Sequence, residues 1–348
     1  MRDKNRISVV VVAICLVIGV QVKNAHSAWQ IMNDGQPIDM GEREVYMSAS
    51  GVDKNGNIVV VFTQRSESRV LHLYGKYLNG KKWISLNMGK PIDNPGAGST
   101  VHVSIRYDSS GKMLIGYYQS ETEGKKSQLY INTWDGMNLS SLNKGKAIND
   151  KMKRIEYLPN SKSDINGNFV SIASVWKNNK YKLLLIQKLS KDLKSKWFRM
   201  ENISNAVKGG SQMPSIAMIS NEEAICAYRQ PEGSTFRLFA SLWKNGQMMP
   251  MNGGRPIDNG SGKIEKSSIT YHGNSGAVVI YMQNLSILKA IKWDGKQWKP
   301  LNSDAPVNKP NGKTVWSPAA ETDKNGNIVV TYLQETGRNM RLYGSYYY

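Results

Sequence analysis

Nine side chains spread over the chain could together hold a sugar or an anionic group. Aromatic rings stack on sugars, and guanidinium and carboxylate groups bind polar or charged ligands through charge-assisted, often bidentate hydrogen bonds. Surface loops are polar in any protein, so the same residues also fit a surface without a binding site. The candidates are Arg43, Tyr46, His102, Arg154, Glu156, Tyr157, Arg229, Glu265 and Trp316.

The sequence contains no signature of a cofactor, metal or nucleophile site. It lacks the C-x-x-C-H, H-E-x-x-H, G-x-S-x-G and phosphate-binding glycine-loop motifs. The segment D-x-N-x-N at 53–57 resembles the start of a calcium loop, but an EF-hand loop has glycine at its sixth position and glutamate at its twelfth. Here Gly56 is the fourth residue and Gln64 the twelfth. We therefore assign no catalytic residue, and we expect neither a cofactor nor a metal.

Internal repeats dominate the chain and must position these candidates. The octapeptide DKNGNIVV occurs at 53–60 and again at 323–330. It belongs to a longer unit in which an apolar run ends in glutamine, and such a regular period is typical of repeat architectures. The glutamine either forms a polar ring at the mouth of a channel or caps backbone groups where a strand ends. The six runs end at Gln64, Gln119, Val175, Gln230, Gln283 and Gln334.

Each unit is expected to form four short strands, which in the first unit cover 45–52, 57–64, 69–78 and 82–87. These segments are rich in β-branched and aromatic residues. Asn-Gly and Asp-Gly pairs, which favour two-residue hairpins, separate the first strand from the second and the third from the fourth. A second marker of the form L-N-x-x-x-P-I-D recurs in variants at 29–39, 83–93, 139–149, 197–207, 248–258 and 298–308.

Four antiparallel strands repeated six times predict an all-β fold, a six-bladed β-propeller. The C-terminus ends on a third strand, 340–348, whereas 29–33 is a fourth strand without a unit of its own. We expect this N-terminal strand to complete the last blade, so that residues 28–348 form one domain.

One face of such a ring should carry the loops before each first strand and after each second strand. These loops hold the more charged and less repetitive residues, whereas the Asn-Gly and Asp-Gly turns belong to the opposite face. We therefore expect a ligand in an axial depression on the loop face. The loops after the second strands contribute Arg65, Arg69, Arg229, Arg237, Arg338 and Arg341.

The first 27 residues have the layout of a secretory signal peptide. A basic start precedes a 16-residue apolar run at 7–22, and Ala25 and Ser27 are small residues before the expected cleavage point. We expect export to the periplasm or the cell exterior. The alternative is an uncleaved anchor, because 16 apolar residues are near the lower limit for a membrane span.

Without residues 1–27 the chain carries 42 basic and 26 acidic side chains, a net charge of +16. A field of this sign favours anionic partners, although lysine also serves solubility alone. The lysines are scattered and form no basic tract, which argues against nucleic acid. The expected partner is a polysaccharide or another anionic surface ligand, with a protein partner as an alternative. Membrane contact is expected only through an uncleaved signal segment.

The D-x-x-G-N turn, the closing aromatic residue and the six-fold count resemble the propellers of the sialidase-like and fucose-lectin-like groups. The resemblance implies architecture over 29–348. A sialidase would imply an arginine triad, a Tyr–Glu pair and an aspartic acid, and the segment KRIEY at 153–157 lacks the proline of the R-I-P tripeptide. A lectin would imply an arginine, a glutamate and a tryptophan in each repeat, of which only the tryptophan recurs. The sialidase candidates are Arg43, Arg154, Arg229, Tyr157 and Glu265.

Three functions remain open. The basic charge and the uniform repeats favour a non-catalytic module that binds a glycan or an anionic surface. A sialidase-like glycoside hydrolase is the first alternative, and a protein assembly module is the second.

Overall fold

A computed structural model of the chain describes seventeen segments, with backbone only for 106–107, 127, 129 and 160–187. Its regular elements are β-strands and short 3₁₀ helices, without an α-helix in the described segments. In the same segments no helix has the length and apolar character needed to cross a membrane. The segments are 28–41, 43–53, 57–79, 82–95, 97–107, 112–120, 127–142, 144–147, 160–163, 169–177, 180–187, 210–220, 223–245, 247–271, 276–309, 313–323 and 326–348.

The described strands form five four-stranded sheets and one three-stranded sheet. Within each sheet, neighbouring strands run antiparallel. The first sheet contains β2 (Val45–Val52), β3 (Ile58–Arg65), β4 (Leu71–Asn79) and β5 (Lys82–Ser85). The second contains β6 (Thr100–Tyr107), β7 (Met113–Ser120), β8 (Ser127–Trp134) and β9 (Leu139–Ser141). The three-stranded sheet contains β10 (Asn160–Ser163), β11 (Phe169–Lys177) and β12 (Lys180–Gln187).

Three further four-stranded sheets complete the described part of the chain. One contains β13 (Gln212–Ser220), β14 (Glu223–Glu232), β15 (Thr235–Lys244) and β16 (Gln247–Pro250). The next contains β17 (Ile264–Tyr271), β18 (Ala277–Gln283), β19 (Ile287–Trp293) and β20 (Trp298–Pro300). The last contains β21 (Val315–Thr322), β22 (Ile328–Thr336), β23 (Asn339–Tyr347) and β1 (Trp29–Ile31). The 3₁₀ helices are η1 (Asn33–Gly35), η2 (Leu86–Gly89), η3 (Asn252–Gly254) and η5 (Leu301–Asp304).

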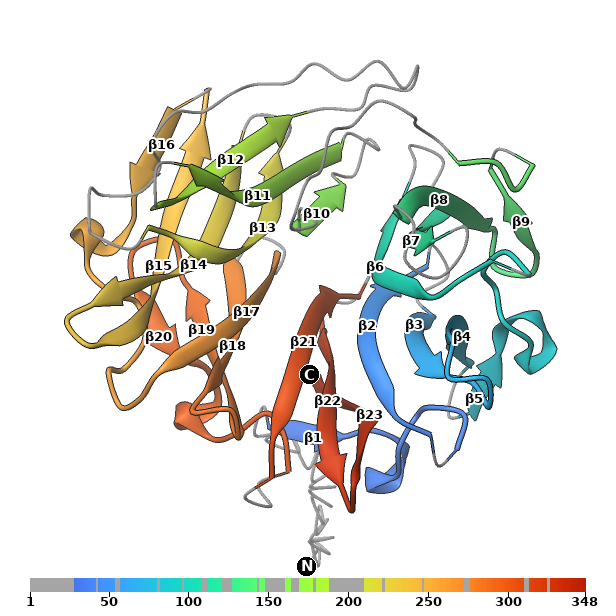
Figure 1. Ribbon diagram of the computed structural model, residues 1–348. Coiled ribbons are helices and arrows are strands. Elements are labelled where there is room, and N and C mark those ends of the chain that lie inside the picture. The colour runs from blue at the N-terminus through green and yellow to red at the C-terminus, as the bar shows by residue number, and fades with distance from the viewer. Residues whose placement is uncertain are drawn as a thin grey trace, which may run out of the picture.

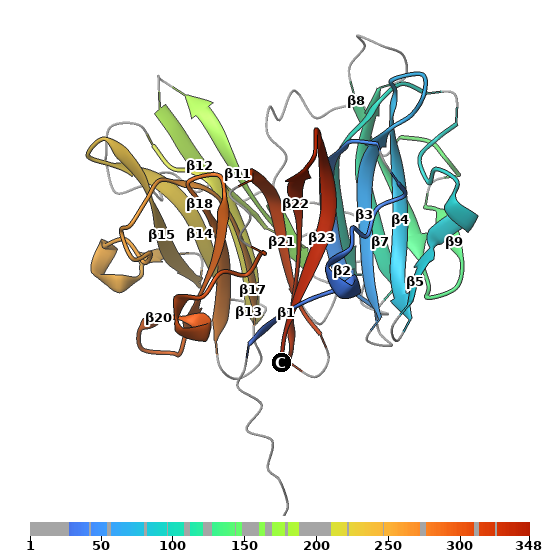
Figure 2. The same cartoon turned by 90° about the horizontal axis from the view of Figure 1, so that it is seen from below.

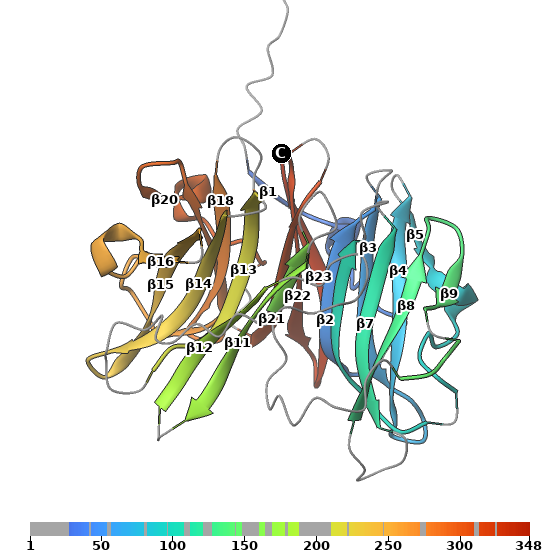
Figure 3. The same cartoon turned by 90° about the horizontal axis from the view of Figure 1, so that it is seen from above.

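The first strand of each sheet lies at the centre of the molecule, and these inner strands close a ring (Figure 1). β2 contacts β6 and β21, β10 contacts β6 and β13, and β17 contacts β13 and β21. Their order around the axis is therefore β2, β6, β10, β13, β17 and β21. Edge-on views show the strands running through the thickness of the ring (Figures 2 and 3).

The N-terminal strand β1 belongs to the last sheet, as the sequence predicts. Trp29 pairs with Tyr347 and Ile31 with Ser345. Met32, which follows β1, packs closely against Gly344 of β23. A Cβ atom on Gly344 would lie 2.9 Å from the Met32 sulfur. In the first sheet a Cβ atom on Gly75 would likewise lie 2.6 Å from the side chain of Leu86. In both sheets, therefore, the glycine of the third-strand sequence L-Y-G leaves room for the side chain of the residue that follows the fourth strand.

The core lies between neighbouring sheets, because second strands such as β3, β18 and β22 are buried on both faces. Val59 and Val61 of β3 pack toward the second sheet, with Ile105 and Ile115. Val60 and Phe62, which point the opposite way, pack toward the last sheet, with Val329 and Leu333. Successive side chains of a strand face opposite sides, so a strand with two buried faces must be apolar throughout. This explains the continuous apolar run of each repeat.

The L-N-x-x-x-P-I-D marker is a connection between sheets. Its asparagine adopts a left-handed backbone conformation, with φ of 50° to 54° at Asn33, Asn87, Asn252 and Asn302. Asparagine tolerates this conformation better than most residues. The Asn87 and Asn252 amides each donate a hydrogen bond to the proline carbonyl four residues later, at 2.7 Å. The isoleucine that follows is buried, and the connection therefore turns sharply and inserts into the core.

The aspartate of the same marker fastens the connection to the third strand of the preceding sheet. Asp258 accepts a hydrogen bond from the backbone N–H of Leu238 at 2.8 Å. Asp39 does the same for Leu342 at 3.1 Å. In the next connection Asn308 replaces the aspartate and accepts from the Leu288 N–H at 2.8 Å. Buried N–H groups need an acceptor, and the marker supplies it.

In both copies of the octapeptide the aspartate binds the asparagine four residues later, and the second strand begins directly after that asparagine. Asp53 accepts hydrogen bonds from the Asn57 backbone at 2.8 Å and from its side chain at 2.9 Å. Asp323 accepts the equivalent pair from Asn327, at 2.9 and 2.8 Å. The repeated octapeptide is therefore explained by turn geometry.

At three of its positions the recurring glutamine caps the backbone, as one of the two interpretations expects, whereas the bonds given for Gln230 and Gln283 join side chains. Gln64 and Gln334 each donate to a backbone carbonyl of the connection before the inner strand, those of Arg43 and Lys309, both at 2.8 Å. Gln119 is fully buried and donates to the carbonyls of two residues in the corresponding connection. The third unit's Val175 has only its backbone described, and the marker at 197–207 lies outside the described residues.

Candidate functional site

Six of the nine predicted site residues are described, and they belong to or lie next to the beginnings of the inner strands, where each described four-stranded sheet has an irregularity. The pairing register shifts near the start of β2, β6, β13, β17 and β21. His102, Met213 and Ser317 in these bulges adopt φ of 55°, 48° and 50°. A bulge bends the strand and redirects the side chains beside it. We call the ring face at which these strands begin the loop face.

Arg229 and Glu265 form a largely buried ion pair on the loop face. Arg229 Nη1 lies 2.7 Å from Glu265 Oε2, and the two side chains are 14% and 12% exposed. Its Nη2 donates to Gln212 Oε1 at 2.8 Å. The guanidinium also lies over the Phe236 ring, 4.5 Å from its centre. Arg229 Nε has no protein partner within the described residues. The structure thus brings two predicted residues together across β14 and β17.

Lys263 extends this cluster, since its ammonium lies 2.6 Å from Glu265 Oε1. Glu265 therefore faces two cations, and its carboxylate is already neutralised. A ligand carboxylate near this cluster would meet more positive than negative charge. Free carboxylate chemistry by Glu265 is correspondingly disfavoured, because both of its oxygens are engaged.

Tyr46 lies on the same face and binds Glu44, a residue that the sequence analysis did not single out. The Tyr46 hydroxyl donates to Glu44 Oε2 at 2.5 Å. The Arg65 guanidinium lies over the Tyr46 ring, 4.9 Å from its centre. Burial, and then the bond to Glu44, raise the pKa of Tyr46 above its ordinary value. This tyrosine is therefore held protonated at neutral pH.

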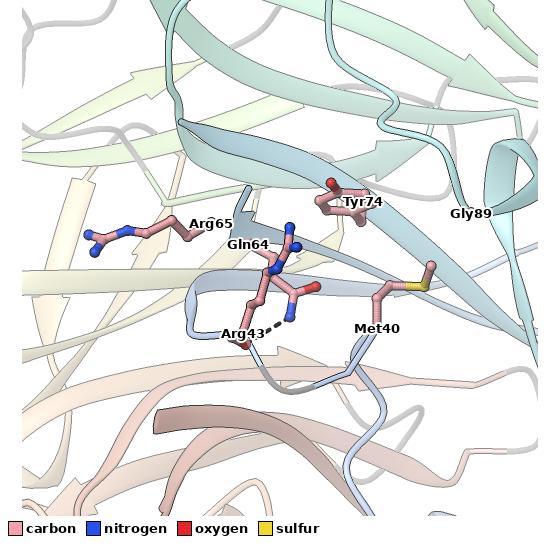
Figure 4. A pocket seen from close by; sticks show the side chains of 6 residues that line it. All are labelled: Met40, Arg43, Gln64, Arg65, Tyr74 and Gly89. Carbon is pink, nitrogen blue, oxygen red and sulfur yellow. Dashed lines mark hydrogen bonds between the residues drawn. The ribbon is translucent and has the colours of Figure 1, made fainter. Parts of the chain in front are cut away.

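Arg43 lines a shallow hollow of about 580 Å³ at the edge of the first sheet. Its guanidinium pairs with the exposed Glu67 at 2.6 Å. Figure 4 shows Arg43 beside Tyr74 and Met40, whereas the Arg65 side chain extends away from it. The two guanidinium groups therefore do not converge on one anion. The hollow is lined by Met40, Arg43, Gln64, Arg65, Tyr74 and Gly89.

His102 and Lys266 belong to two inner strands of the ring, β6 and β17. His102 is part-buried on β6, where its backbone N–H contacts Met47 Sδ at 3.3 Å. Burial, followed by the positive charge of Lys266, lowers the pKa of His102 from its ordinary 6.5. Lys266 on β17 donates to Ser317 Oγ at 3.4 Å. Burial lowers the pKa of Lys266 from 10.5 to about 8. The sequence signal for Lys266 was a second charged residue, directly after Glu265, in the inner strand IEKSSITY.

Trp316 at the start of β21 is 38% exposed, and it is the sole tryptophan among the large exposed hydrophobic residues of the described segments. A bulge follows it, between Trp316 and Ala319. An exposed indole on a rigid strand provides a flat surface on which a sugar ring can stack. The predicted residues Arg154, Glu156 and Tyr157 lie outside the described residues.

Two of the loop arginines have a structural role. Arg237 Nε lies 2.8 Å from Asp258, and Arg341 Nε lies 2.8 Å from Asp39. Both carboxylates are fully buried. These arginines therefore support the connections between sheets, and the expectation that they face a ligand was wrong in that respect.

Comparison with solved structures identifies the architecture. A protein of unknown function from Dyadobacter fermentans DSM 18053 aligns with a TM-score of 0.62 at 12% identity, covering 92% of this chain and 97% of that one. Penicillium chrysogenum alpha-L-arabinanase complexed with arabinobiose aligns with a TM-score of 0.61 at 14% identity, covering 90% and 95%. The fold is a β-propeller. It is similar to the propellers of sialidases, as the sequence resemblance implied, and also to those of an arabinanase and an arabinofuranosidase.

Trypanosoma rangeli sialidase in complex with sialic acid also aligns, with a TM-score of 0.60 at 11% identity. The alignment covers 91% of this chain and 58% of the sialidase chain. At these identities the similarity concerns the fold alone. No family model matches the chain, and no curated protein matches it either.

Proposed function

We propose that the chain is an exported six-bladed β-propeller that binds an acidic glycan or another anionic surface ligand on its loop face. In this proposal residues 1–27 are a signal peptide, residues 28–348 form one domain, and the sheet β10–β12 is one of the six blades. The protein acts as a binding module and catalyses no reaction. It works in the periplasm or outside the cell.

The exposed Trp316, next to a residue that binds Lys266, carries the proposal. Trp316 is the second residue of β21 and precedes Ser317, whose hydroxyl accepts a hydrogen bond from Lys266 of the neighbouring inner strand β17 at 3.4 Å. Glu265 of β17 binds two further cations, Arg229 and Lys263. An aromatic platform next to cations suits a sugar that bears an acidic group. The net charge of +16 over residues 28–348 would draw such a ligand in from solution. Similar structures bound to arabinobiose and sialic acid support a sugar as the ligand class.

The test is binding of the purified protein to polygalacturonate, dextran sulfate and neutral dextran at low and high salt. We expect retention on the acidic polymers that weakens with salt, because exposed charges are screened beyond about 10 Å at 0.1 M salt. Trp316→Ala should weaken binding about tenfold or more, as loss of a stacking contact does. Tyr348→Ala is the control, since Tyr348 is exposed and contacts Tyr346, which bonds to the turn residue Asn327 at the opposite face. Absence of binding to every polymer would refute the proposal.

A glycoside hydrolase is the second candidate, favoured by the Tyr46–Glu44 bond of 2.5 Å. Sialidases use a tyrosine nucleophile, and a carboxylate at this distance could accept its proton. The raised pKa of Tyr46 and the carboxylate-bound Arg43 and Arg229 count against it. Release of 4-methylumbelliferone from sialoside or arabinofuranoside substrates, abolished in Tyr46→Phe, would establish this candidate in place of the first.

A further inference from the structure

The hollow at the edge of the first sheet has the size of a small-molecule site. Its volume of about 580 Å³ lies within the range of about 300–1,000 Å³ that is typical of ligand pockets. Figure 4 shows the Arg43 guanidinium, the Tyr74 ring and the Met40 thioether around this space. A cation, an aromatic ring and an apolar group therefore line one cavity.

Arg43 departs from the repeat. Glu44, Ser99 and Lys263 hold equivalent places, because the backbone carbonyl of each accepts a hydrogen bond from the residue that follows the recurring glutamine. Arg43 precedes Glu44, whereas a glycine precedes each of the other two. The last sheet has Lys313 at this position. The fold of the connection therefore does not require an arginine, and Arg43 distinguishes the first sheet from the others compared.

Met40 departs from the repeat in the same two sheets. It directly follows the aspartate of the L-N-x-x-x-P-I-D marker, where the sheets of β6 and β17 have Asn94 and Asn259. The Asn94 amide donates to the Gly145 carbonyl at 3.3 Å. The Asn259 amide donates to Asp304 Oδ2 at 3.0 Å. These bonds join the connections before and after a sheet. A thioether has no N–H to donate, so Met40 cannot make this link, and the hollow lies at this place.

The Arg43 guanidinium is accessible to a ligand. Its ion-pair partner within the described residues is Glu67, and the two side chains are 48% and 90% exposed. Exposed ion pairs are weak because water screens them, so a carboxylate that enters the hollow can displace Glu67. Arg237 and Arg341 differ in this respect, since each is paired with a fully buried aspartate.

Tyr74 provides a fixed wall and a hydrogen-bond donor. Its ring stacks on the fully buried Phe62, with the ring centres 6.1 Å apart. Burial, and then the negative charge of Asp93, raise the pKa of Tyr74, so its hydroxyl remains protonated at neutral pH. An aromatic surface with a polar tip is suited to a sugar, which has both apolar C–H groups and hydroxyls.

We propose that the hollow binds one uronic acid unit, with the sugar carboxylate on the Arg43 guanidinium and the sugar ring between Tyr74 and Met40. The inference rests on the proposed function, because it specifies the acidic sugar. It adds a site on the first sheet to that of Trp316, which belongs to the last. A guanidinium binds a carboxylate through two parallel hydrogen bonds, which a neutral sugar cannot form. Glu67 competes with the ligand for this guanidinium.

The methyl group of Met40 provides a direct measurement of binding in the hollow. Protein with isotope-labelled methionine methyl groups is titrated by NMR with sodium galacturonate, galactose and sodium sulfate at constant ionic strength, and Met40→Leu assigns the resonance. We expect galacturonate to shift this resonance until the site is saturated. The methyl resonance of Met249, which is exposed on β16 of another sheet, should not move. An equal response to galactose or to sulfate would overturn the uronic acid as ligand.

Two variants should change galacturonate affinity in opposite directions. Arg43→Gln should weaken binding about tenfold or more, the range expected for loss of a bidentate charge-assisted contact. Glu67→Gln should strengthen binding about two- to fivefold, because it removes the competing carboxylate. Arg255→Gln is the matched control, since Arg255 is exposed in the connection after β16 and its replacement removes the same charge. Equal weakening by Arg43→Gln and Arg255→Gln would overturn the site, because net charge alone would explain it.

Failure of this site can be told apart from failure of the proposed function. Retention of the wild type on polygalacturonate without a shift of the Met40 methyl resonance would refute the hollow and leave the proposed function intact. A saturable Met40 shift that is lost in Arg43→Gln would support the hollow even if no polymer were retained. Absence of both responses would refute the site and the proposed function together.

Discussion

Replacement of Asp258 by alanine should be among the most destabilising single changes in this propeller. The carboxylate is fully buried and bonds to the Arg237 guanidinium at 2.8 Å. It also accepts from the backbone N–H groups of Leu238 at 2.8 Å and Gly260 at 3.1 Å. Asp258→Ala leaves these donors without their acceptor in a site that water does not reach.

Breaking a buried ion pair by removing one partner costs about 3–5 kcal/mol. Arg237 retains a second contact, to the half-exposed Glu232 at 3.0 Å, so the lower end of this range applies, about 3 kcal/mol. Asp258→Asn keeps an oxygen for the Leu238 N–H, as Asn308 does for Leu288. It loses the charge and replaces Oδ2, the acceptor for the Arg237 Nε–H and the Gly260 N–H, with an amide donor, so it should cost about 2 kcal/mol.

Urea unfolding followed by tryptophan fluorescence measures these changes as shifts of the midpoint at constant slope. Glu232→Ala is the matched control, because it removes a surface partner of the same guanidinium and should change stability by less than about 1 kcal/mol. If Asp258→Ala were no more destabilising than Glu232→Ala, the connection would not depend on the aspartate. If Asp258→Asn were as damaging as Asp258→Ala, the charge and the contacts of Oδ2 with Arg237 and Gly260 would dominate over the bond to the Leu238 N–H.

Three further changes test other parts of the structure. Gly276→Ala should destabilise by roughly 2–4 kcal/mol in the same urea assay, because φ is +95° there and a Cβ atom would lie 2.1 Å from the Trp293 carbonyl oxygen; unchanged stability would contradict this backbone. Gln119→Leu should cost about 1–3 kcal/mol, since the buried amide that binds the Asn94 N–H and carbonyl is lost, and a neutral outcome would disprove the cap. Lys266→Met should be more stable than wild type by on the order of 2–3 kcal/mol at pH 7. The unfolded chain keeps the Lys266 proton up to about pH 10.5, whereas the folded chain loses it near pH 8. The free energy of unfolding of the wild type should therefore rise between these two pH values, and the stability advantage of Lys266→Met should shrink. A constant stability difference between the two proteins from about pH 7 to 10 would refute the burial of the charge.

The strand pattern and the repeats could be predicted from the sequence because their causes are local. Asn-Gly and Asp-Gly turns, apolar runs such as NIVVVFTQ and a constant spacing reflect backbone preferences and the two-residue period of strands. The orphan strand at 29–33 followed from counting strands, and its pairing with β23 confirms it. The L-N-x-x-x-P-I-D marker could be recognised in the sequence as a repeat, but the sequence did not show that it connects neighbouring sheets.

The partners of the polar side chains were decided by the tertiary structure. Arg229 and Arg237 look equivalent in the sequence, yet one meets Glu265 on the loop face and the other a buried aspartate between sheets. Bulges at the start of the inner strands redirect side chains in a way that strand alternation does not anticipate.

Arg341 and Asp39 are separated by 302 positions in the chain and meet only because the ring closes. The sequence by itself determined which segments become strands and how they repeat, because hydrophobic period and turn chemistry act over a few residues. The closure of the ring decided which charged side chains form pairs, because that depends on contacts between residues far apart in the chain.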